Sequence, residues 1–279
     1  MNITSLVKKQ KQFFQTGATV KCANRIAALN RLEKAILQYE QEIILALHAD
    51  LNKSAFESYM TEIGMVLEEL RYMKKHLVSF SRPRLRPTPL AQFPAISFEY
   101  PQPYGCVLIM SPWNYPFLLT MEPLIGAIAA GNCCIVKPSR SSSNTSSLIR
   151  RILADIFPEK YIAVVEGGHN ENTLLLNQNF DYIFFTGSTH VGQVVLKKAA
   201  RHLTPVSLEL GGKSPCIVDE TADLKCSAKR ILFGKLINAG QTCVAPDYLL
   251  IQESVKDQWI YYAQKELKRM YGDHPIQNP

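Results

Sequence analysis

Apolar residues in the first eighty positions recur at the spacing of an α-helix. Successive members of one set lie three or four positions apart, which places them on a single helical face. The members of this set are Leu29, Leu32, Ile36, Tyr39, Ile43 and Leu47. A second helical stretch covers residues 54–80. The pattern therefore predicts a helical N-terminal part over residues 1–80.

The character of the chain changes between residues 81 and 103. Six prolines in this stretch fix φ at their positions and exclude a helix. Residues 96–100 alternate between apolar and polar side chains, as in a strand of an exposed sheet. We expect this segment to form an arm or hairpin and not a linker.

Strand-like and helical runs alternate from residue 104 onward. The strand-like runs cover residues 105–110, 133–136, 161–165, 182–185, 206–210 and 216–218. This alternation is typical of βαβ units and predicts an α/β fold, a doubly wound parallel sheet with helices on both faces. Ligands of such folds bind at the carboxyl ends of the strands, so the residues just after each strand are the candidates for chemistry.

Composition restricts the class of protein further. The 279 residues are 47% hydrophobic and 20% charged, which indicates a globular protein of about two domains. No apolar run is long enough to span a membrane, and the first residues show no secretory signal. The net charge of +7 comes from scattered basic residues, which are densest at Arg82, Arg84 and Arg86. We therefore expect neither a nucleic acid nor a membrane partner.

The seven cysteines contain no CxxC pair and show no zinc-ligand spacing. An odd number also excludes a fully paired disulfide framework, so reduced thiols in the cytoplasm and no metal site are expected. Most of the cysteines lie in strand-like runs, where a thiol behaves as a small buried hydrophobe. Cys243 differs, because it lies in a polar, glycine-containing loop after a predicted helix at residues 228–237. A thiol in such a loop can be exposed and activated, although a structural cysteine remains the alternative.

Polar residues follow the first two strands of the alternating part. Asn114 offers a neutral amide donor that can stabilise an oxyanion, but a proline-rich turn with packed aromatic residues explains the same string. Lys137 precedes a serine-rich helix start at residues 141–144, where unpaired N–H groups and a positive charge attract anions. The alternative at this second position is a capped helix beside a solvated lysine.

Two later strands end in glycine-containing turns. Residues 187–192 form a G-x-T-x-x-G turn between a strand and a helix, where backbone can approach a pyrophosphate. Glu209 lies at a strand end beside two glycines and is a candidate general base. The alternative for Glu209 is a loop carboxylate that is either solvated or paired with Lys213.

Five strings in this order resemble the aldehyde dehydrogenase superfamily. They are PWNYPF (112–117), KPS (137–139), FTGSTHVG (185–192), LELGGKSP (208–215) and GQTCVAPDY (240–248). The N-terminal helical region and the CVAPDY string look most like the class 3 branch, which handles medium- and long-chain aliphatic or aromatic aldehydes. The resemblance implies a helical part of the cofactor domain at 1–80 and an oligomerisation arm at 81–103. It also implies a Rossmann-like NAD(P)-binding domain at 104–210 and an incomplete α/β catalytic domain at 211–279.

The resemblance further implies oxidation of an aldehyde to a carboxylic acid with NAD or NADP in a cytoplasmic protein that forms homodimers. The Cys243 thiolate would attack the aldehyde, Asn114 and the Cys243 backbone N–H would hold the oxyanion, and Glu209 would activate water. Lys137 would contact the adenosine ribose. The other cofactor-binding positions implied by the match are Trp113, Ser139, Arg140, Gly187, Ser188, Gly192, Leu210 and Gly211.

The sequence departs from the family pattern at Arg140, where many relatives carry a glutamate that bonds the ribose hydroxyls. An arginine attracts a 2′-phosphate, which predicts that NADP is tolerated or preferred. The alternative is that Arg140 faces solvent.

A second departure is that the family's later Glu–x–Phe–Gly–Pro motif and the strands around it are missing, and residues 271–279 resemble a loop. Two hypotheses follow: an active dehydrogenase, alone or with a companion chain, and a catalytically inactive truncated remnant that binds nucleotide or pairs with a full-length relative. A CoA-acylating relative within the superfamily is a further alternative. A thiol hydrolase would need a histidine base, and the available His169, His190, His202 and His274 match no protease signature.

Overall fold

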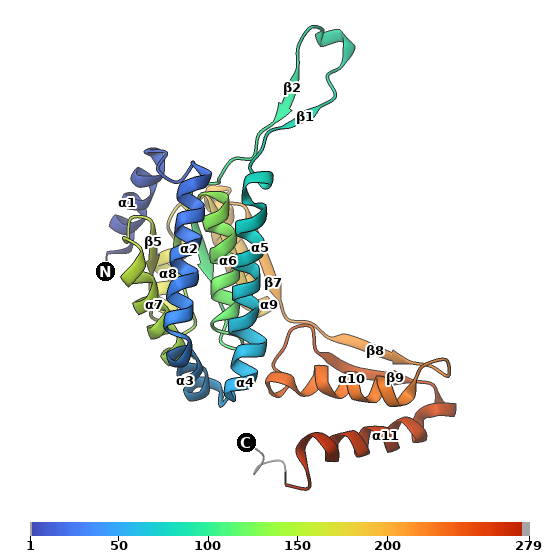
Figure 1. Cartoon of the computed structure of the whole chain (residues 1–279). Helices are drawn as coiled ribbons and strands as arrows, with labels where there is room; N and C mark the ends of the chain where they lie inside the picture. Colours follow the sequence, from blue (N-terminus) through green and yellow to red (C-terminus); the bar gives the residue numbers. More distant parts are fainter. Residues whose placement is uncertain (1, 275–279) are drawn as a thin grey trace. The chain divides into compact units, whose positions relative to one another are not determined.

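The computed structural model describes residues 2–274, which fall into two units, Met1–Glu209 and Leu210–Pro279 (Figure 1). The first unit begins with helices and continues into a parallel sheet. The second unit pairs two strands with two helices. Each unit is described by itself below.

The N-terminal helices form where the apolar spacing predicts them. They are α1 (Ile3–Gln15), α2 (Cys22–Gln38), α3 (Glu40–Leu51), α4 (Ala55–Ser58) and α5 (Gly64–Phe80), with a π-helical turn at Tyr59–Ile63 between the last two. Leu29, Leu32, Ile36, Ile43 and Leu47 are all fully buried, which confirms the predicted apolar face. This face spans two helices, because the backbone at Tyr39 leaves helical geometry at ψ 10° and ends α2.

A five-stranded sheet forms the centre of the first unit. Its strands are β3 (Cys106–Met110), β4 (Cys133–Lys137), β5 (Ile162–Val164), β6 (Tyr182–Gly187) and β7 (Val206–Leu210). The spatial order is β5-β4-β3-β6-β7, so the chain first builds outward on one side of β3 and then on the other. The pairs β3–β4, β3–β6 and β4–β5 are parallel. This reversal of direction confirms the predicted doubly wound, Rossmann-like sheet.

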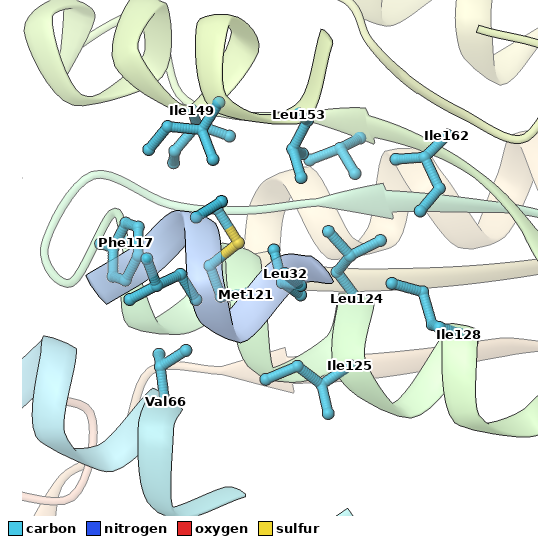
Figure 2. Close-up of a cluster of buried hydrophobic side chains, with 14 of the residues drawn as sticks. Leu32, Val66, Phe117, Met121, Leu124, Ile125, Ile128, Ile149, Leu153 and Ile162 are labelled. Atoms are coloured by element: carbon cyan, nitrogen blue, oxygen red, sulfur yellow. The ribbon is translucent and has the colours of Figure 1, made fainter. Parts of the chain in front are cut away.

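Helices connect the strands and cover the sheet. The connecting helices are α6 (Leu118–Ala130), α7 (Ser143–Ile156), α8 (His169–Leu176) and α9 (Thr189–Ala199). Right-handed crossovers on the two sides of β3 place α6 and α7 on one face and α9 on the opposite face. Figure 2 shows the core beneath the first face, where Leu32 of α2, Val66 of α5, Leu124 of α6, Ile149 of α7 and Ile162 of β5 belong to one buried cluster.

The proline-rich segment forms a hairpin, as the sequence predicts. β1 (Arg84–Arg86) pairs antiparallel with β2 (Ser97–Glu99), and a short 3₁₀ turn at Leu90–Gln92 lies between them. Figure 1 shows the hairpin extending away from the helices of its own unit. Its apolar side chains at Leu85, Leu90 and Phe93 are exposed.

The second unit contains β8 (Ser214–Val218), α10 (Leu224–Leu236), β9 (Pro246–Ile251) and α11 (Glu253–Tyr271). β8 and β9 are parallel, with α10 between them in the chain, and Val218, Ala228, Trp259 and Ala263 form its small core. The predicted loop over residues 271–279 begins only after Tyr271, which is still helical, and residues 275–279 lie outside the described part. Within residues 2–274, no helix has both the length and the apolar character needed to cross a bilayer.

Candidate active site

The strand register brings the predicted chemistry-bearing segments to one edge of the sheet. Met110 at the end of β3 is paired with Lys137 at the end of β4 and with Phe185 on β6. Val136 is likewise paired with Val164 at the end of β5. Because these strands are parallel, the segments that follow them begin side by side at the carboxyl edge, which is where α/β folds bind ligands.

A cavity of about 290 Å³ opens at this edge. It is lined by Met110 and Ser111 after β3, Lys137, Pro138, Ser139, Arg140 and Ser141 after β4, Gly167 and Gly168 after β5, His169 and Asn172 of α8, Phe185 of β6 and Val191 of α9. Three of the predicted cofactor-binding residues, Lys137, Ser139 and Arg140, therefore share one cavity.

Lys137 lines this cavity and is buried, so its side chain is not solvated. Only 4% of the residue is exposed, and its Nζ donates to the carbonyl oxygens of Pro138 and Gly167, both at 2.8 Å. Burial holds the pKa of Lys137 below its usual value, while the carboxylates of Glu171 and Glu166 oppose that shift. The alternative of a solvated lysine beside a helix is therefore wrong.

Arg140 is exposed but lines the cavity, so it does not simply point into solvent. Its guanidinium lies against Gly168, since a β-carbon added to that glycine would be 3.2 Å from Nη1. Ser139 holds the start of the next helix, because its carbonyl oxygen accepts from the hydroxyls of Ser142 and Ser146. The cavity therefore presents a cationic side chain on each side of Ser139.

Acidic side chains occupy three of the four helix N-termini at this edge. The Glu62 carboxylate accepts from the backbone N–H groups of Phe117 and Leu118 at the start of α6. The Asp50 carboxylate accepts from those of Asn144 and Thr145 at the start of α7. The expected unpaired N–H groups at the serine-rich start are thus taken by Asp50, and this part of the prediction is wrong. An anion would compete with a fixed carboxylate at either position.

The start of α8 is closed in the same way by Glu171, whose Oε2 accepts from the Gly168 N–H at 2.6 Å. At α9 the cap is only the Ser188 hydroxyl, which accepts from the Val191 N–H at 3.4 Å. Among the described residues, α9 is the one connecting helix at this edge whose N-terminus carries no carboxylate. It begins directly after Gly187 and buries Gly192 in its first turn, at the position of the G-x-T-x-x-G string.

The loop before α6 carries Trp113 and Asn114. Trp113 is 42% exposed and Asn114 is half-buried, whereas Tyr115 and Phe117 are buried and anchor the loop. The ring of Tyr115 lies 4.2 Å from the Lys53 ammonium, which itself pairs with Glu62 at 2.5 Å. Both of the alternatives drawn from the sequence thus hold in part: the aromatic residues are packed, and an amide side chain stands among them.

Glu209 lies on β7, where it is exposed. Lys213, its suggested partner in the sequence, forms an ion pair with Asp247 at 3.3 Å within the second unit. Leu210 is half-buried and Gly211 is exposed, and a β-carbon added to Gly211 would meet no atom within 4 Å.

Cys243 is an exposed free thiol in the second unit. The loop before it contains Asn238 and Ala239 in the left-handed region at φ 53° and 52°, followed by Gly240 at φ 78°. Such conformations are uncommon for residues with a β-carbon and recur at functional loops. Gly212 approaches this loop closely, because a β-carbon added there would lie 2.5 Å from the Cys243 carbonyl oxygen. The second glycine of the LELGGKSP string is thus required by the close approach of the Cys243 backbone.

Sequence reasoning overlooked the turn after β5. Gly167, Gly168, His169 and Asn172 line the cavity, although no residue after this strand was chosen as a candidate. The rule that ligands bind after each strand, applied to the glycine pair at 167–168, would have found them. The Oδ1 atom of Asn172 is buried and is one of four buried side-chain oxygens or nitrogens that lack a hydrogen-bond partner in the described part of the chain.

Residues 1–278 match the family model described as the aldehyde dehydrogenase family. The chain belongs to this family. Aldehyde dehydrogenases are oxidoreductases, and the α/β architecture described above is the family's fold.

Several known aldehyde dehydrogenases are similar to this chain. It is 49% identical over 269 residues to 4,4′-diaponeurosporen-aldehyde dehydrogenase of Staphylococcus aureus (strain NCTC 8325 / PS 47), covering 96% of this chain and 59% of the relative. It is 42% identical over 272 residues to the dimeric NADP-preferring aldehyde dehydrogenase of Canis lupus familiaris, covering 97% and 60%. It is 41% identical over 273 residues to aldehyde dehydrogenase family 3 member A2 of Mus musculus, which agrees with the class 3 resemblance.

The solved structure described as the substrate-bound state of Staphylococcus aureus AldH superposes with a TM-score of 0.98 at 48% identity. That match covers all of this chain and 61% of the other. The chain thus spans about three fifths of the length of the aldehyde dehydrogenases that it matches.

Proposed function

We propose that this chain binds NAD or NADP in the cavity at the carboxyl edge of the sheet and carries the nucleophile for oxidation of an aldehyde to a carboxylic acid. One observation carries the binding part of the proposal. The cavity holds the Lys137 ammonium beside the N-terminus of α9, which lacks the carboxylate found on the three neighbouring helices. Cationic side chains and a helix N-terminus without a carboxylate favour the binding of a dinucleotide's phosphates.

The residues of the cavity fit such a cofactor. Asn172 Oδ1 is a buried acceptor without a partner, and an amino or hydroxyl group of a bound nucleotide would satisfy it. Gly167 and Gly168 add no side chain to the cavity wall. Lys137 and Ser139 would hold the adenosine ribose, and Gly187, Ser188 and Gly192 would support the phosphates. Trp113, Leu210 and Gly211 complete the proposed set.

The proposed chemistry uses residues of both units. The Cys243 thiolate attacks the aldehyde carbonyl and forms a thiohemiacetal, while the Asn114 amide and the Cys243 backbone N–H stabilise its oxyanion. A neutral amide suits this role, because it stabilises the oxyanion without neutralising it. A bound NAD or NADP would supply the acceptor for the hydride that must leave the thiohemiacetal carbon. Glu209 then takes a proton from water, which attacks the resulting thioester and releases the acid and the thiol.

The exposure of Cys243 supports its role as nucleophile, since the thiols of Cys106, Cys133 and Cys134 are buried. Burial raises the pKa of Cys133 to about 12 and raises that of Cys106 and Cys134 as well. These three cannot supply a thiolate near neutral pH.

Arg140 supports a preference for NADP. Its guanidinium borders the same cavity as Lys137, where it would pair with a 2′-phosphate on the ribose. Arg140→Glu replaces that donor with a carboxylate that repels the phosphate. We expect this variant to lose affinity for adenosine 2′,5′-bisphosphate and to keep its affinity for AMP, as measured by isothermal titration calorimetry. Equal affinity losses for both ligands would refute the NADP preference.

Activity is tested on the 279-residue chain with hexanal and benzaldehyde, by following formation of NADPH and NADH. We expect turnover that Cys243→Ala abolishes, whereas Cys226→Ala, which changes another exposed thiol of the same unit, should leave turnover unchanged. Nucleotide binding without turnover would support the second candidate, a protein that binds NAD(P) without catalysis. This candidate is favoured by the position of the cavity, because all of its lining residues belong to the first unit and the nucleophile belongs to the second.

The hairpin β1–β2 supports self-association into a homodimer. Leu90 and Phe93 near its tip are 88% and 81% exposed, which is unusual for large apolar side chains unless another surface covers them. Sedimentation should show a dimer that Leu90→Ser with Phe93→Ser converts to a monomer, and an unchanged mass would contradict this assignment. The seven free thiols support a reducing, cytoplasmic location.

A further inference from the structure

The peptide unit between Gly167 and Gly168 connects two opposite charges. Its N–H group, on Gly168, donates to the Glu171 carboxylate at 2.6 Å. Its carbonyl group, on Gly167, accepts from the Lys137 ammonium at 2.8 Å. The positive N–H end of this peptide dipole therefore meets a carboxylate, and its negative carbonyl end meets an ammonium group. Each hydrogen bond polarises the peptide and so strengthens the other hydrogen bond.

Both glycines are required for this arrangement. Gly167 has φ +127°, and a β-carbon there would lie 2.3 Å from the Glu171 Oε2 atom. The carboxylate thus packs directly against the backbone at a place that any side chain would fill. A β-carbon on Gly168 would lie 3.2 Å from the Arg140 guanidinium.

The bonds to Lys137 define where its remaining donor can go. An ammonium has three N–H donors, and two of them point to the carbonyl oxygens of Pro138 and Gly167. The direction of the third is set once these two carbonyl groups are fixed. Because Lys137 lines the cavity, this third donor is the one available to a ligand there.

We propose that Glu171 is a positioning residue for nucleotide binding: it fixes the Gly167–Gly168 peptide, which in turn aims the third N–H of Lys137 into the cavity. This inference rests on the proposed function, in which the cavity takes the adenosine part of NAD(P). The competing role for Glu171 is that of an ordinary helix cap, since it is the third residue of α8 and bonds the residue before that helix. An ordinary cap would stabilise α8 without acting through Lys137.

NADP⁺ binding by the full chain, measured by isothermal titration calorimetry, separates the two roles. We expect Glu171→Ala to weaken binding about tenfold, the scale of one hydrogen bond to a charged group. Glu171→Gln keeps an acceptor for the Gly168 N–H and should stay within about threefold of the wild type. Combined with Lys137→Met, Glu171→Ala should add no further loss, because its effect passes through the lysine.

Asp223→Ala is the matched control, because Asp223 is also a capping carboxylate, on α10 of the second unit. It should leave NADP⁺ binding unchanged. An equal loss from Glu171→Ala with and without Lys137→Met, or no loss at all, would overturn the proposal in favour of an ordinary cap.

A second measurement does not depend on nucleotide binding. The pH dependence of Lys137 acetylation by acetic anhydride, read by peptide mass spectrometry, reports the protonation of its ammonium. The charges that act on this group are the carboxylates of Glu171 and Glu166 and the guanidinium of Arg140, in addition to burial. Glu171→Gln removes a stabilising negative charge but keeps the acceptor for the Gly168 N–H, so the midpoint should move to lower pH.

Glu171→Ala also releases the peptide that holds Lys137, so its midpoint should lie above that of Glu171→Gln. Equal midpoints in the two variants would overturn the proposal. If the wild type binds neither NADP⁺ nor NAD⁺, the proposed function fails. The difference between the acetylation midpoints of Glu171→Gln and Glu171→Ala then decides the role of Glu171 by itself.

Discussion

Replacement of Lys53 by methionine should destabilise the first unit strongly, because it leaves a buried carboxylate without its counter-ion. The side chains of Lys53 and Glu62 are 1% and 0% exposed, and Nζ lies 2.5 Å from Oε1. The second carboxylate oxygen caps α6 through the N–H groups of Phe117 and Leu118. Glu62 therefore cannot turn toward solvent without uncapping this helix.

The size of the effect follows from these contacts. At 2.5 Å and an effective dielectric constant of about 20, the Coulomb attraction is about 7 kcal/mol. The Lys53 ammonium also lies 4.2 Å from the Tyr115 ring centre, which adds about 2 kcal/mol when desolvated. The variant no longer has to bury the ammonium, which recovers several kcal/mol. The net loss should be about 4 kcal/mol, within the range of about 3–5 kcal/mol for breaking a buried pair.

Urea unfolding followed by Trp113 fluorescence in a Trp259→Phe background measures this loss, because Trp113 is then the single tryptophan and lies in the first unit. Lys74→Met is the matched control, since its partner Glu33 is partly exposed. It should cost less than about 1 kcal/mol. Combining Lys53→Met with Glu62→Gln should restore at least half of the lost stability, because no charge is then left unpaired.

The loss should also depend on pH. Burial already raises the pKa of Glu62 in the folded protein, and removal of Lys53 raises it further. A carboxyl group with a raised folded pKa binds protons more readily when folded, so its contribution to stability is lost as pH rises through that pKa. The deficit of Lys53→Met should therefore be largest near about pH 8 and shrink toward about pH 5. A deficit that is below about 1 kcal/mol or constant with pH would refute the reasoning.

Three further substitutions test the loops and caps. Gly212→Ala forces a β-carbon against the Cys243 carbonyl oxygen, so it should lower the stability of the second unit by about 2 kcal/mol and change the rate of Cys243 alkylation by iodoacetamide. Gly211→Ala should change neither quantity, and equal effects of the two substitutions would contradict the close approach. Asp50→Ala removes the cap of α7 and should cost about 1–2 kcal/mol in urea unfolding, and no change would mean that the bonds add nothing. Ala239→Gly relieves a left-handed residue with an exposed side chain and should stabilise the second unit by about 1 kcal/mol, so destabilisation would refute strain at this position.

The strands and the ligand-binding edge could be predicted because their signals are local. A buried parallel strand is a short apolar run, and β3 and β4 are fully buried along their length. The residues that follow such runs are brought to one edge by the parallel register alone. Lys137 was found in this way, the family resemblance added Ser139 and Arg140, and the structure gathers all three in one cavity.

The acidic caps of α6 and α7 could not be predicted, because the contacts that define them are distant in sequence. Glu62 reaches the start of α6 across 55 positions, and Asp50 reaches Asn144 across 94. In the sequence, both are single acidic residues in a helical region, where a solvated carboxylate is the usual reading. The same limit applies to Lys53, whose burial follows only from the packing of the N-terminal helices against the loop before α6.

The sequence by itself determined the helices and strands, the doubly wound sheet and the family, because apolar periodicity and short motifs are properties of neighbouring residues. Only the tertiary structure decided that the N-termini of α6 and α7 are closed to an anion, since that depends on carboxylates from the N-terminal helical part. It also decided that Lys137 is buried and held by the Gly167–Gly168 turn. Burial removes the water that would otherwise satisfy a charged group, so such a group must find its partners in whatever the fold brings beside it.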